Sequence, residues 1–266
     1  MNTLTDLADL SGRRAIITGG AGHLGRVMAQ TLAGMGADLV LVDLDSQKLE
    51  DLGQELNDQF SSVVQTISCD LESEDERGDL AKKVLETGEI NILINNAAFV
   101  GTTELHGWAE PFEKQTLKAW RRAMEVNLTA AFHLSQLFAP SLKVNRGSSI
   151  INIGSIYGSI APDWSLYEGT DMANPAAYGV SKAALTQLTK WLTTTLGPSV
   201  RVNSISLGGI ERGQPAKFIG RYIKKTPLCR MACEEDIIGA IAFLSSDMSS
   251  YVTGHNLSVD GGWSIS

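Results

Sequence analysis

Seven short apolar runs alternate with six stretches of helical periodicity in this 266-residue sequence. Runs such as "AIIT" and "ILIN" are apolar without alternation, as expected of strands that are buried on both faces. Strands that alternate with helices predict a parallel sheet with helices on both faces, a doubly wound α/β fold in a single domain over residues 1–266. The predicted strands are 14–18, 38–43, 63–67, 91–95, 148–153, 200–205 and 256–260, and the predicted helices are 24–35, 46–58, 73–87, 115–138, 175–196 and 234–246.

The first predicted strand leads into the glycine-rich segment "TGGAGHLG", residues 18–25. Ligands of open parallel sheets bind at the carboxyl ends of the strands, where this segment lies. Gly20, Gly22 and Gly25 match the pattern G-x-G-x-x-G, whose glycines allow a tight turn and close approach to a pyrophosphate. A helix that begins near His23 would point its free N–H groups at that pyrophosphate. The pattern by itself also fits an ordinary tight turn.

Asp43 ends the second predicted strand, 18 residues after Gly25, and supports a dinucleotide site. A carboxylate at this position can accept hydrogen bonds from both hydroxyls of the adenosine ribose. It would repel a 2′-phosphate, and no Arg or Lys lies in the glycine loop or directly after Asp43 to offset that repulsion. The sequence therefore predicts NAD in preference to NADP. Asp45 is interpreted as a helix cap or a solvated neighbour.

Polar or small residues also follow the third and fourth predicted strands. Asp70, in "SCDL", is placed to contact the adenine, and a helix cap is the alternative interpretation of this residue. The segment "NNAA", residues 95–98, offers small side chains that permit close approach of a flat cofactor. Within it, Asn95 is predicted to join adjacent loops.

Tyr178 and Lys182 lie four residues apart in "YGVSK", on one face of a predicted helix. A free phenol has a pKa of about 10, so it is a poor base at neutral pH. An ammonium roughly 4 Å away, worth about 4 kcal/mol at an effective dielectric of about 20, would bring the pKa of Tyr178 into the range of general acid–base catalysis.

Two further residues complete the predicted catalytic group. Ser155, just past the fifth predicted strand, is placed to donate a hydrogen bond to a substrate oxygen. Asn127, in "MEVNLTAAF", lies inside a predicted helix, where asparagine has no propensity advantage. A distorted turn or a bound water in a proton relay would explain Asn127, and an ordinary surface asparagine is the alternative.

From about Arg13 to the C-terminus, these motifs resemble those of the short-chain dehydrogenase/reductase family. The resemblance is carried in order by "TGGAGHLG", "CDL", "NNAA", "EVNL", "INIGS", "YGVSK" and "VTGHNLSVDGGW". It implies a Rossmann fold with about seven strands and a homotetramer or homodimer. It also implies hydride transfer between the nicotinamide of the cofactor and a carbon of a small-molecule substrate.

The resemblance further implies a role for each predicted site residue. Ser155 polarises the substrate carbonyl or hydroxyl, and Tyr178 transfers the proton. Lys182 lowers the pKa of Tyr178 and holds the nicotinamide ribose, while Asn127 anchors the water of the proton relay. The implied cofactor contacts are Gly19, Gly22, His23, Leu24, Gly25, Asp43, Leu44, Asp70, Leu71, Asn96, Ala97, Ala98, Tyr178, Lys182, Gly208 and Ile210.

Some segments depart from the pattern of compact family members. Such members usually carry T-G-x-x-x-G-x-G, but His23 occupies the sixth position, and T-G-x-x-G-x-x-G matches the extended branch of nucleotide-sugar epimerases and dehydratases. Ser155 and Tyr178 are also farther apart, 23 residues, than in compact members. The C-terminal segment is that of a compact member. We therefore expect a compact architecture with an active-site segment of extended character.

The segment "SLGGIERG", residues 206–213, departs as well. Leu207 replaces the proline that is typical of compact members, and Glu211 and Arg212 stand where a side chain is expected to close over the nicotinamide carboxamide. Ile210 is expected to bind that carboxamide through its backbone.

Two loops, 99–115 and 157–175, are predicted to form the substrate pocket. Both combine aromatic with polar side chains, a composition that suits a polyhydroxylated ring and equally serves a packed lid. His106 is interpreted as a solvated loop residue. The candidate substrate contacts are Ser155, Tyr167, Glu168 and Trp108.

The net charge of −8 argues against a nucleic-acid or anionic-membrane surface. The cysteines, Cys69, Cys229 and Cys233, are too few and scattered for a disulfide framework, and nothing near "CRMAC" completes a zinc site, so no metal is expected. The polar N-terminus does not resemble a signal peptide, and no apolar run is long enough to span a bilayer. A cytoplasmic location is expected.

The leading hypothesis is an NAD-dependent oxidoreductase that acts on a secondary alcohol or ketone, with a sugar or sugar nucleotide favoured by the extended-like segment. A 3-ketoacyl thioester or small alcohol is the alternative substrate. A catalytically silent NAD-binding sensor is the alternative from another class. The helices at 115–138 and 175–196 carry apolar residues beyond a single stripe, which favours contact with a partner subunit.

Overall fold

A seven-stranded sheet, in the order β3-β2-β1-β4-β5-β6-β7, is the centre of the computed structural model, which describes residues 3–100 and 103–266. Every neighbouring pair of its strands is parallel. The strand order reverses beside β1, which makes this a doubly wound Rossmann fold and confirms the predicted fold class. The strands are β1 (Arg14–Thr18), β2 (Asp38–Asp43), β3 (Val64–Ser68), β4 (Ile92–Asn95), β5 (Ser148–Ser155), β6 (Val200–Leu207) and β7 (Asn256–Val259).

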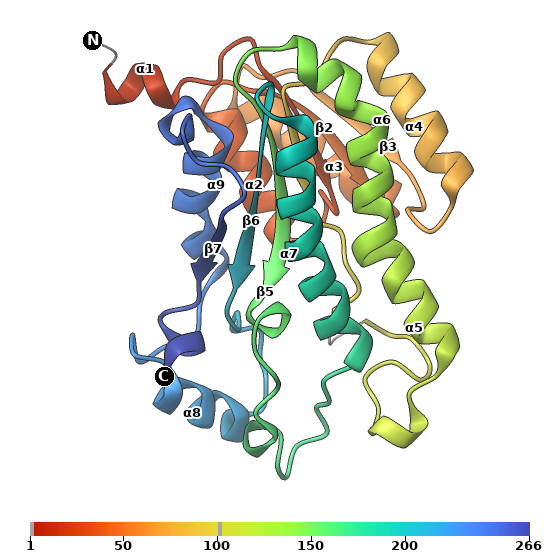
Figure 1. Ribbon diagram of the computed structural model, residues 1–266, viewed down its shortest axis with the longest axis vertical. Helices are drawn as coiled ribbons and strands as arrows, with labels where there is room; N and C mark the ends of the chain where they lie inside the picture. The colour runs from red at the N-terminus through yellow and green to blue at the C-terminus, as the bar shows by residue number, and fades with distance from the viewer. Residues whose placement is uncertain (1–2, 101–102) are drawn as a thin grey trace.

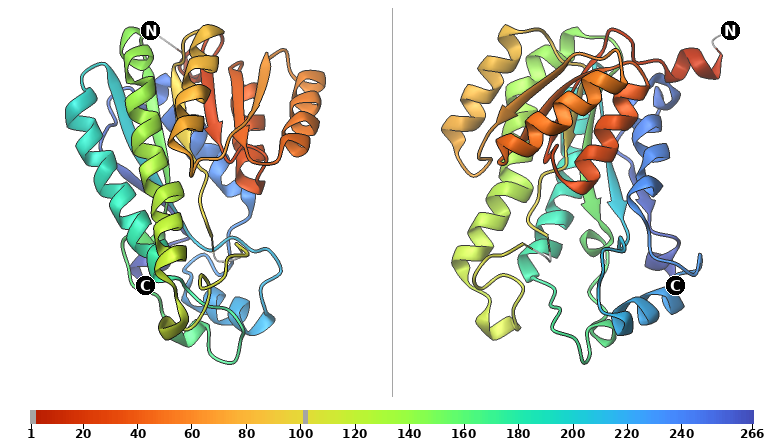
Figure 2. Two further views of the ribbon diagram at one scale, coloured as in Figure 1. Left: turned by 90° about the vertical axis from the view of Figure 1, so that its right-hand side faces the viewer. Right: turned by 180° about the vertical axis from the view of Figure 1, so that it is seen from behind.

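Helices cover both faces of the sheet. The α-helices are α1 (Leu4–Ala8), α2 (His23–Gly34), α3 (Ser46–Gln59), α4 (Glu74–Glu86), α5 (Leu117–Met124), α6 (Ala130–Val144), α7 (Ala176–Leu196), α8 (Ala216–Lys225) and α9 (Ile238–Ser245). Helices α4, α6 and α7 lie in front of the sheet in Figure 1. Helices α2, α3 and α9 lie on the opposite face, towards the viewer in the right-hand part of Figure 2.

Strand β1 shows how the sheet separates two hydrophobic cores. Ala15 and Ile17 point into the core under α2, α3 and α9, and Ile16 points into the core under α4, α6 and α7. All three residues are fully buried, because successive side chains of a strand point to opposite faces and both faces are covered. The apolar run "AIIT" therefore lacks alternation because β1 is buried on both faces, as predicted.

The remaining structure gathers beyond the carboxyl ends of the strands. Helix α8 and the segments around 105–115 and 160–175 lie at the lower end of the molecule in Figure 1. Helices α1 and α8 are not predicted from the sequence. Helix α8 is short, and it buries Phe218 and Tyr222 against distant aromatic residues rather than against a sheet face. No helix in the described ranges is long and apolar enough to cross a bilayer.

Two predicted boundaries change in a way that matters for the site. Strands β5 and β6 run two residues farther than predicted, so Ser155 is the last residue of β5 rather than the residue just past it. The predicted helix 115–138 is divided into α5 and α6 by a π-helical turn at Glu125–Thr129. That turn contains Asn127, which agrees with the predicted distortion.

Candidate active site

The glycine loop joins β1 to α2 and leaves the start of that helix open. Gly19 has φ +64°, a conformation that favours glycine, and a Cβ on Gly25 would lie 2.1 Å from the carbonyl oxygen of Gly19. Gly22 precedes α2 and provides no side-chain cap. The first N–H groups of α2, from His23 onwards, therefore have no intrahelical partner and can bind an anionic group.

Asp43, at the end of β2, lies against this loop. One oxygen of its carboxylate accepts a hydrogen bond from the N–H of Ala21 (3.0 Å), and the other accepts from the N–H of Leu44 (2.8 Å). Asp45 accepts a hydrogen bond from the N–H of Lys48 at 3.1 Å and caps α3, which is one of the two predicted interpretations. The carboxylate of Asp43 is thus held beside the glycine loop, as a ribose-binding group requires.

The end of β4 is tied to the glycine loop by Asn96 and not by Asn95 as predicted. The amide of Asn96 donates to the carbonyl oxygens of Thr18 (2.9 Å) and Gly19 (3.1 Å), and the N–H groups of Asn96 and Ala97 donate to the hydroxyl of Thr18. Asn95 points into the sheet and donates to the side chain of Asn152 at 2.8 Å. Thr18, the first letter of the glycine motif, is a structural residue that the sequence did not single out.

Asp70 does not cap a helix. Its carboxylate accepts from the N–H of Glu72 at 2.9 Å, while Ser73 caps α4. The turn at 69–73, which includes Leu71, follows β3 at the same edge of the sheet as the glycine loop. This placement is compatible with the predicted adenine contact.

The π-helical turn aims the side chain of Asn127 into the protein. Asn127 is 2% exposed, so the surface interpretation is wrong. Its carbonyl oxygen accepts from the N–H of Phe99 (2.7 Å), and its amide donates to the hydroxyl of Ser181 (3.1 Å). Asn127 therefore joins the segment after β4 to α7. Ser181, directly before Lys182 in "YGVSK", is a partner that sequence reasoning missed.

Tyr178, Lys182 and Ser155 come together where α7 crosses the end of β5. The hydroxyl of Ser155 accepts from the N–H of Tyr157 (3.2 Å), and a hydrogen bond from Ser155 acts to lower the pKa of Tyr178. The amine of Lys182 donates to the carbonyl oxygen of Ile153 (2.7 Å) and lies 5.9 Å from the centre of the Tyr178 ring.

The pKa values of this cluster differ from the prediction that Lys182 lowers the pKa of Tyr178. Burial raises the pKa of Tyr178, and the hydrogen bond from Ser155 offsets only part of that effect. Burial also lowers the pKa of Lys182 from 10.5 to about 8. The amine of Lys182 donates to a backbone carbonyl, and Lys182 is not among the groups that shift the pKa of Tyr178.

The segment after β6 closes on itself. The N–H of Gly208 donates to Val259 (3.0 Å), and the carbonyl of Ile210 accepts from the side chain of Gln214 (2.8 Å). Arg212 pairs with Glu234 at 2.7 Å, and its charge acts to lower the pKa of Tyr178. The closure of a side chain at 211–212 over the nicotinamide carboxamide stays a prediction.

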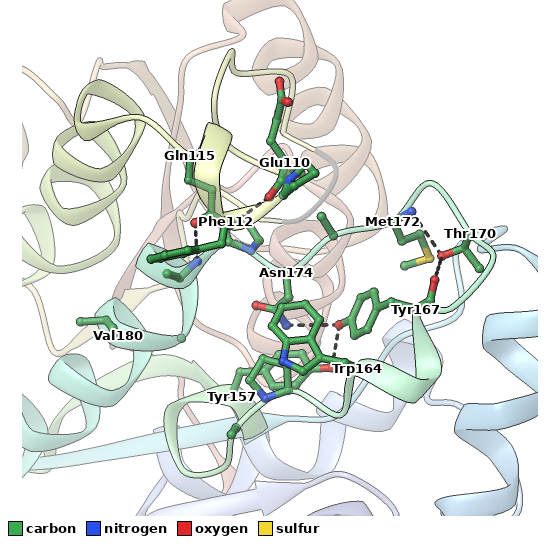
Figure 3. Close-up of a pocket in the computed structure, with 18 of the residues that line it drawn as sticks. Glu110, Phe112, Gln115, Tyr157, Trp164, Tyr167, Thr170, Met172, Asn174 and Val180 are labelled. Atoms are coloured by element: carbon green, nitrogen blue, oxygen red, sulfur yellow. Dashed lines mark hydrogen bonds between the residues drawn. The ribbon is translucent and has the colours of Figure 1, made fainter.

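A cavity of about 800 Å³ opens between the two predicted substrate loops. Its wall includes a hydrogen-bonded group in which the hydroxyl of Tyr157 meets that of Tyr167 (2.8 Å) and Asn174 donates to Tyr167 (3.2 Å), as Figure 3 shows. Ser155, Tyr178 and Lys182 do not line this cavity, since its α7 wall is formed by Ala176, Gly179 and Val180. The cavity therefore lies beside the predicted catalytic cluster and does not contain it.

Two predicted substrate contacts are corrected by the structure. Trp108 is 1% exposed, donates through its indole N–H to Val100 (2.8 Å) and packs against α5, so it supports its loop from within. Glu168 has an exposed side chain outside the cavity wall, and its carbonyl accepts from Arg221. Tyr167 does line the cavity, and His106 is exposed as predicted. Gly101 and Thr102 of the predicted loop 99–115 lie outside the described residues.

The fold and the strand ends at this edge of the sheet are those of the dinucleotide-binding α/β class. A family model described as enoyl-(acyl carrier protein) reductase matches residues 19–264. The chain is 32% identical over 265 residues to the 7alpha-hydroxysteroid dehydrogenase of Escherichia coli K12. The aligned region covers 97% of this chain and 96% of the dehydrogenase. The protein belongs to the short-chain dehydrogenase/reductase family.

Solved structures agree with this assignment. A short-chain type dehydrogenase/reductase from Mycobacterium marinum has a TM-score of 0.85 at 30% identity, with 100% of each chain covered. A gluconate 5-dehydrogenase from Burkholderia cenocepacia, in complex with NADP and tartrate, has a TM-score of 0.87 at 27% identity, with 99% of this chain and 100% of that chain covered. No group of three or more His, Cys, Asp or Glu side chains suited to a metal occurs in the part of the chain that the structure describes.

We expect Lys182→Met to stabilise the folded protein at pH 7. The folded-state pKa of about 8 lies below the ordinary value of 10.5, so the buried charge is penalised at every pH below about 8. This difference corresponds to about 3 kcal/mol, less roughly 1 kcal/mol for the lost hydrogen bond to Ile153. Melting temperatures at pH 7 and pH 9.5 check the sign, because the gain should shrink as the pH rises from about 8 towards 10.5.

Lys190→Met, at an exposed position of the same helix, is the matched control and should change the melting temperature little at either pH. A Lys182→Met protein that melts no higher than the wild type at pH 7 would contradict the expected penalty.

Proposed function

We propose that this protein is an NAD-dependent oxidoreductase that interconverts a secondary alcohol and a ketone. The observation that carries the proposal is the meeting, at one edge of the sheet, of an open helix start and a Ser155–Tyr178–Lys182 cluster. The glycine loop fits a dinucleotide, because Gly22 leaves the start of α2 without a side-chain cap and its first N–H groups can bind a pyrophosphate. When bound, NAD supplies the hydride acceptor or donor at its nicotinamide.

The chain's own residues supply binding and proton transfer. The glycine loop and the start of α2 hold the pyrophosphate, and Asp43 holds the adenosine ribose. Ser155 accepts a hydrogen bond from the N–H of Tyr157 and donates to Tyr178, and its hydroxyl hydrogen turns from Tyr178 to the substrate oxygen when a substrate binds. The phenol of Tyr178, whose pKa is raised by burial, is the group that donates the proton as general acid when a carbonyl is reduced.

The preference for NAD rests on charge at the end of β2. The carboxylate of Asp43 lies against the glycine loop, and the cations nearest in sequence are already paired, Lys48 with Asp45 and Arg26 with Glu55. No free cation among these is left to bind a 2′-phosphate. The similar gluconate 5-dehydrogenase from Burkholderia cenocepacia was solved with NADP, so a kinetic comparison of the two cofactors tests this preference.

A sugar or a related polyhydroxylated compound is the substrate class that we propose. The similarity to a gluconate 5-dehydrogenase supports it, as does the long segment between Ser155 and Tyr178. An acyl thioester is the second candidate, favoured by the description of the matching family model.

We place the protein in the cytoplasm, which is consistent with the free thiols of Cys69, Cys229 and Cys233.

Tyr178→Phe should abolish turnover and leave NADH binding within a factor of about two, because only the transferable proton is removed. The substrate comes from an NAD-coupled screen of sugars, sugar nucleotides, ketoacyl thioesters and simple secondary alcohols. NADH affinity is measured by fluorescence on the same preparations. Activity confined to acyl thioesters would refute the sugar proposal, and an active Tyr178→Phe protein would refute the role of the phenol. NADH binding without turnover of any substrate would favour the sensor alternative.

Asp43→Asn should shift cofactor preference towards NADP, since it removes the charge that repels a 2′-phosphate. We expect the ratio of kcat/KM for NAD over that for NADP to fall at least tenfold, equivalent to about 1.4 kcal/mol. Asp51→Asn is the matched control, because Asp51 is an exposed carboxylate of α3 that accepts a hydrogen bond from Gln47, and its loss should not alter the ratio. A wild-type protein that prefers NADP would overturn the assignment of Asp43.

We also propose that the protein is a homodimer or homotetramer. Large apolar side chains are exposed along α5, α6 and α7: Trp120 (37%), Phe132 (40%), Val180 (46%) and Trp191 (54%). Light scattering at micromolar concentration should therefore give at least twice the 28.6 kDa of one chain. Trp191→Glu should lower that mass, and a wild-type mass of one chain would rule the proposal out.

A further inference from the structure

Arg77, on α4, is a buried cation outside the predicted catalytic cluster. Its side chain is 2% exposed, yet it makes polar contacts to three different segments. It donates to the carbonyl oxygen of Leu71 (2.5 Å) and to Nδ1 of His133 (3.0 Å), and it pairs with the carboxylate of Glu125 (2.8 Å). A guanidinium is suited to such a position because it offers several donors in a fixed plane.

One end of this contact set lies in the turn that follows β3. Leu71 and Asp70 occupy the turn at 69–73, on the edge of the sheet that we assign to the adenosine half of the cofactor. The backbone N–H of Asp70 donates a hydrogen bond to the carboxylate of Glu76, a residue of α4 (2.7 Å). The position of this turn therefore depends on α4, and on Arg77 in particular.

The other end lies at the first residue of the π-helical turn. Glu125 begins that turn, and Asn127 follows two residues later with its bonds to Phe99 and Ser181. A second cation, Arg122, makes a similar connection. It donates to both carboxylate oxygens of Glu72 and lies 5.3 Å from the ring centre of Phe99. Both cations thus connect the turn at 69–73 to the elements that place Asn127.

We propose that Arg77 is a positioning residue that couples occupancy of the adenosine side of the cofactor site to the geometry of the Asn127 turn. The proposal rests on the proposed function, because it assumes that a nicotinamide dinucleotide binds at this edge of the sheet. A ligand that presses on the turn at 69–73 acts, through Leu71, Arg77 and Glu125, on the start of the π-helical turn. Arg77 itself touches neither substrate nor the reacting atoms.

The test compares wild type, Arg77→Lys and Arg77→Met by hydrogen–deuterium exchange with and without saturating NADH. In the wild type, NADH should slow exchange in peptides that cover 69–73 and also in those that cover 125–131. In Arg77→Met, protection of 69–73 should remain, while protection of 125–131 should fall at least threefold. The kcat should fall about tenfold and the Kd of NADH should rise by less than fivefold, with Arg77→Lys intermediate.

Lys82→Met is the matched control, since Lys82 lies on the same helix in an exposed ion pair with Asp79 and should change none of these values. If Arg77→Met does not fold, Glu125→Gln replaces it. This variant keeps Arg77 and removes only the negative charge of its partner in the π-helical turn. Equal protection of 125–131 in wild type and either variant would overturn the coupling. Failure of the wild type to bind NADH would instead refute the proposed function.

Discussion

The packing of α7 on β5 is the contact that positions the predicted catalytic residues Ser155, Tyr178 and Lys182. Asn152, fully buried in β5, accepts from Asn95 of β4 and donates to Thr189 of α7 (2.9 Å). Farther along the same strand, Ile153 accepts from the amine of Lys182. These bonds are buried, so losing one partner would leave another polar group unsatisfied in the core. They fix the rotation of α7 and hence the position of Tyr178 beside Ser155.

This arrangement has an electrostatic cost. Burial pushes the pKa of Tyr178 upward and that of Lys182 down to about 8, so each group moves towards its neutral form. Burial is the cause of the lowered pKa of Lys182, and the hydrogen bond to the backbone carbonyl of Ile153 does not offset it. A site of this kind is less stable than an apolar one of the same shape, and the cost is consistent with selection for proton transfer rather than for stability.

The long segment between Ser155 and Tyr178 shapes the surface beside the site. Tyr157, Tyr167 and Asn174 form a hydrogen-bonded wall, and on the far side of Tyr167 an aromatic series continues through Phe218, Tyr222 and Trp263. Helix α8 is bound to the same segment by polar contacts, Arg221 to the carbonyl of Glu168 and Lys225 to Asp163. The segment predicted to hold substrate is therefore also the support on which α8 rests.

The sequence by itself determined the doubly wound sheet, the family and the motif residues at the strand ends, because hydrophobic period and glycine spacing are local properties of the chain. It also indicated a distortion at Asn127. Only the tertiary structure decided that Asn96 rather than Asn95 ties the glycine loop, that Trp108 is a packing residue and that Lys182 faces Ile153. Helix α8 and the contacts of Arg77 were likewise beyond the sequence, since their partners are distant in the chain. Burial and hydrogen-bond partners arise from contacts between remote segments, and no spacing within one segment encodes them.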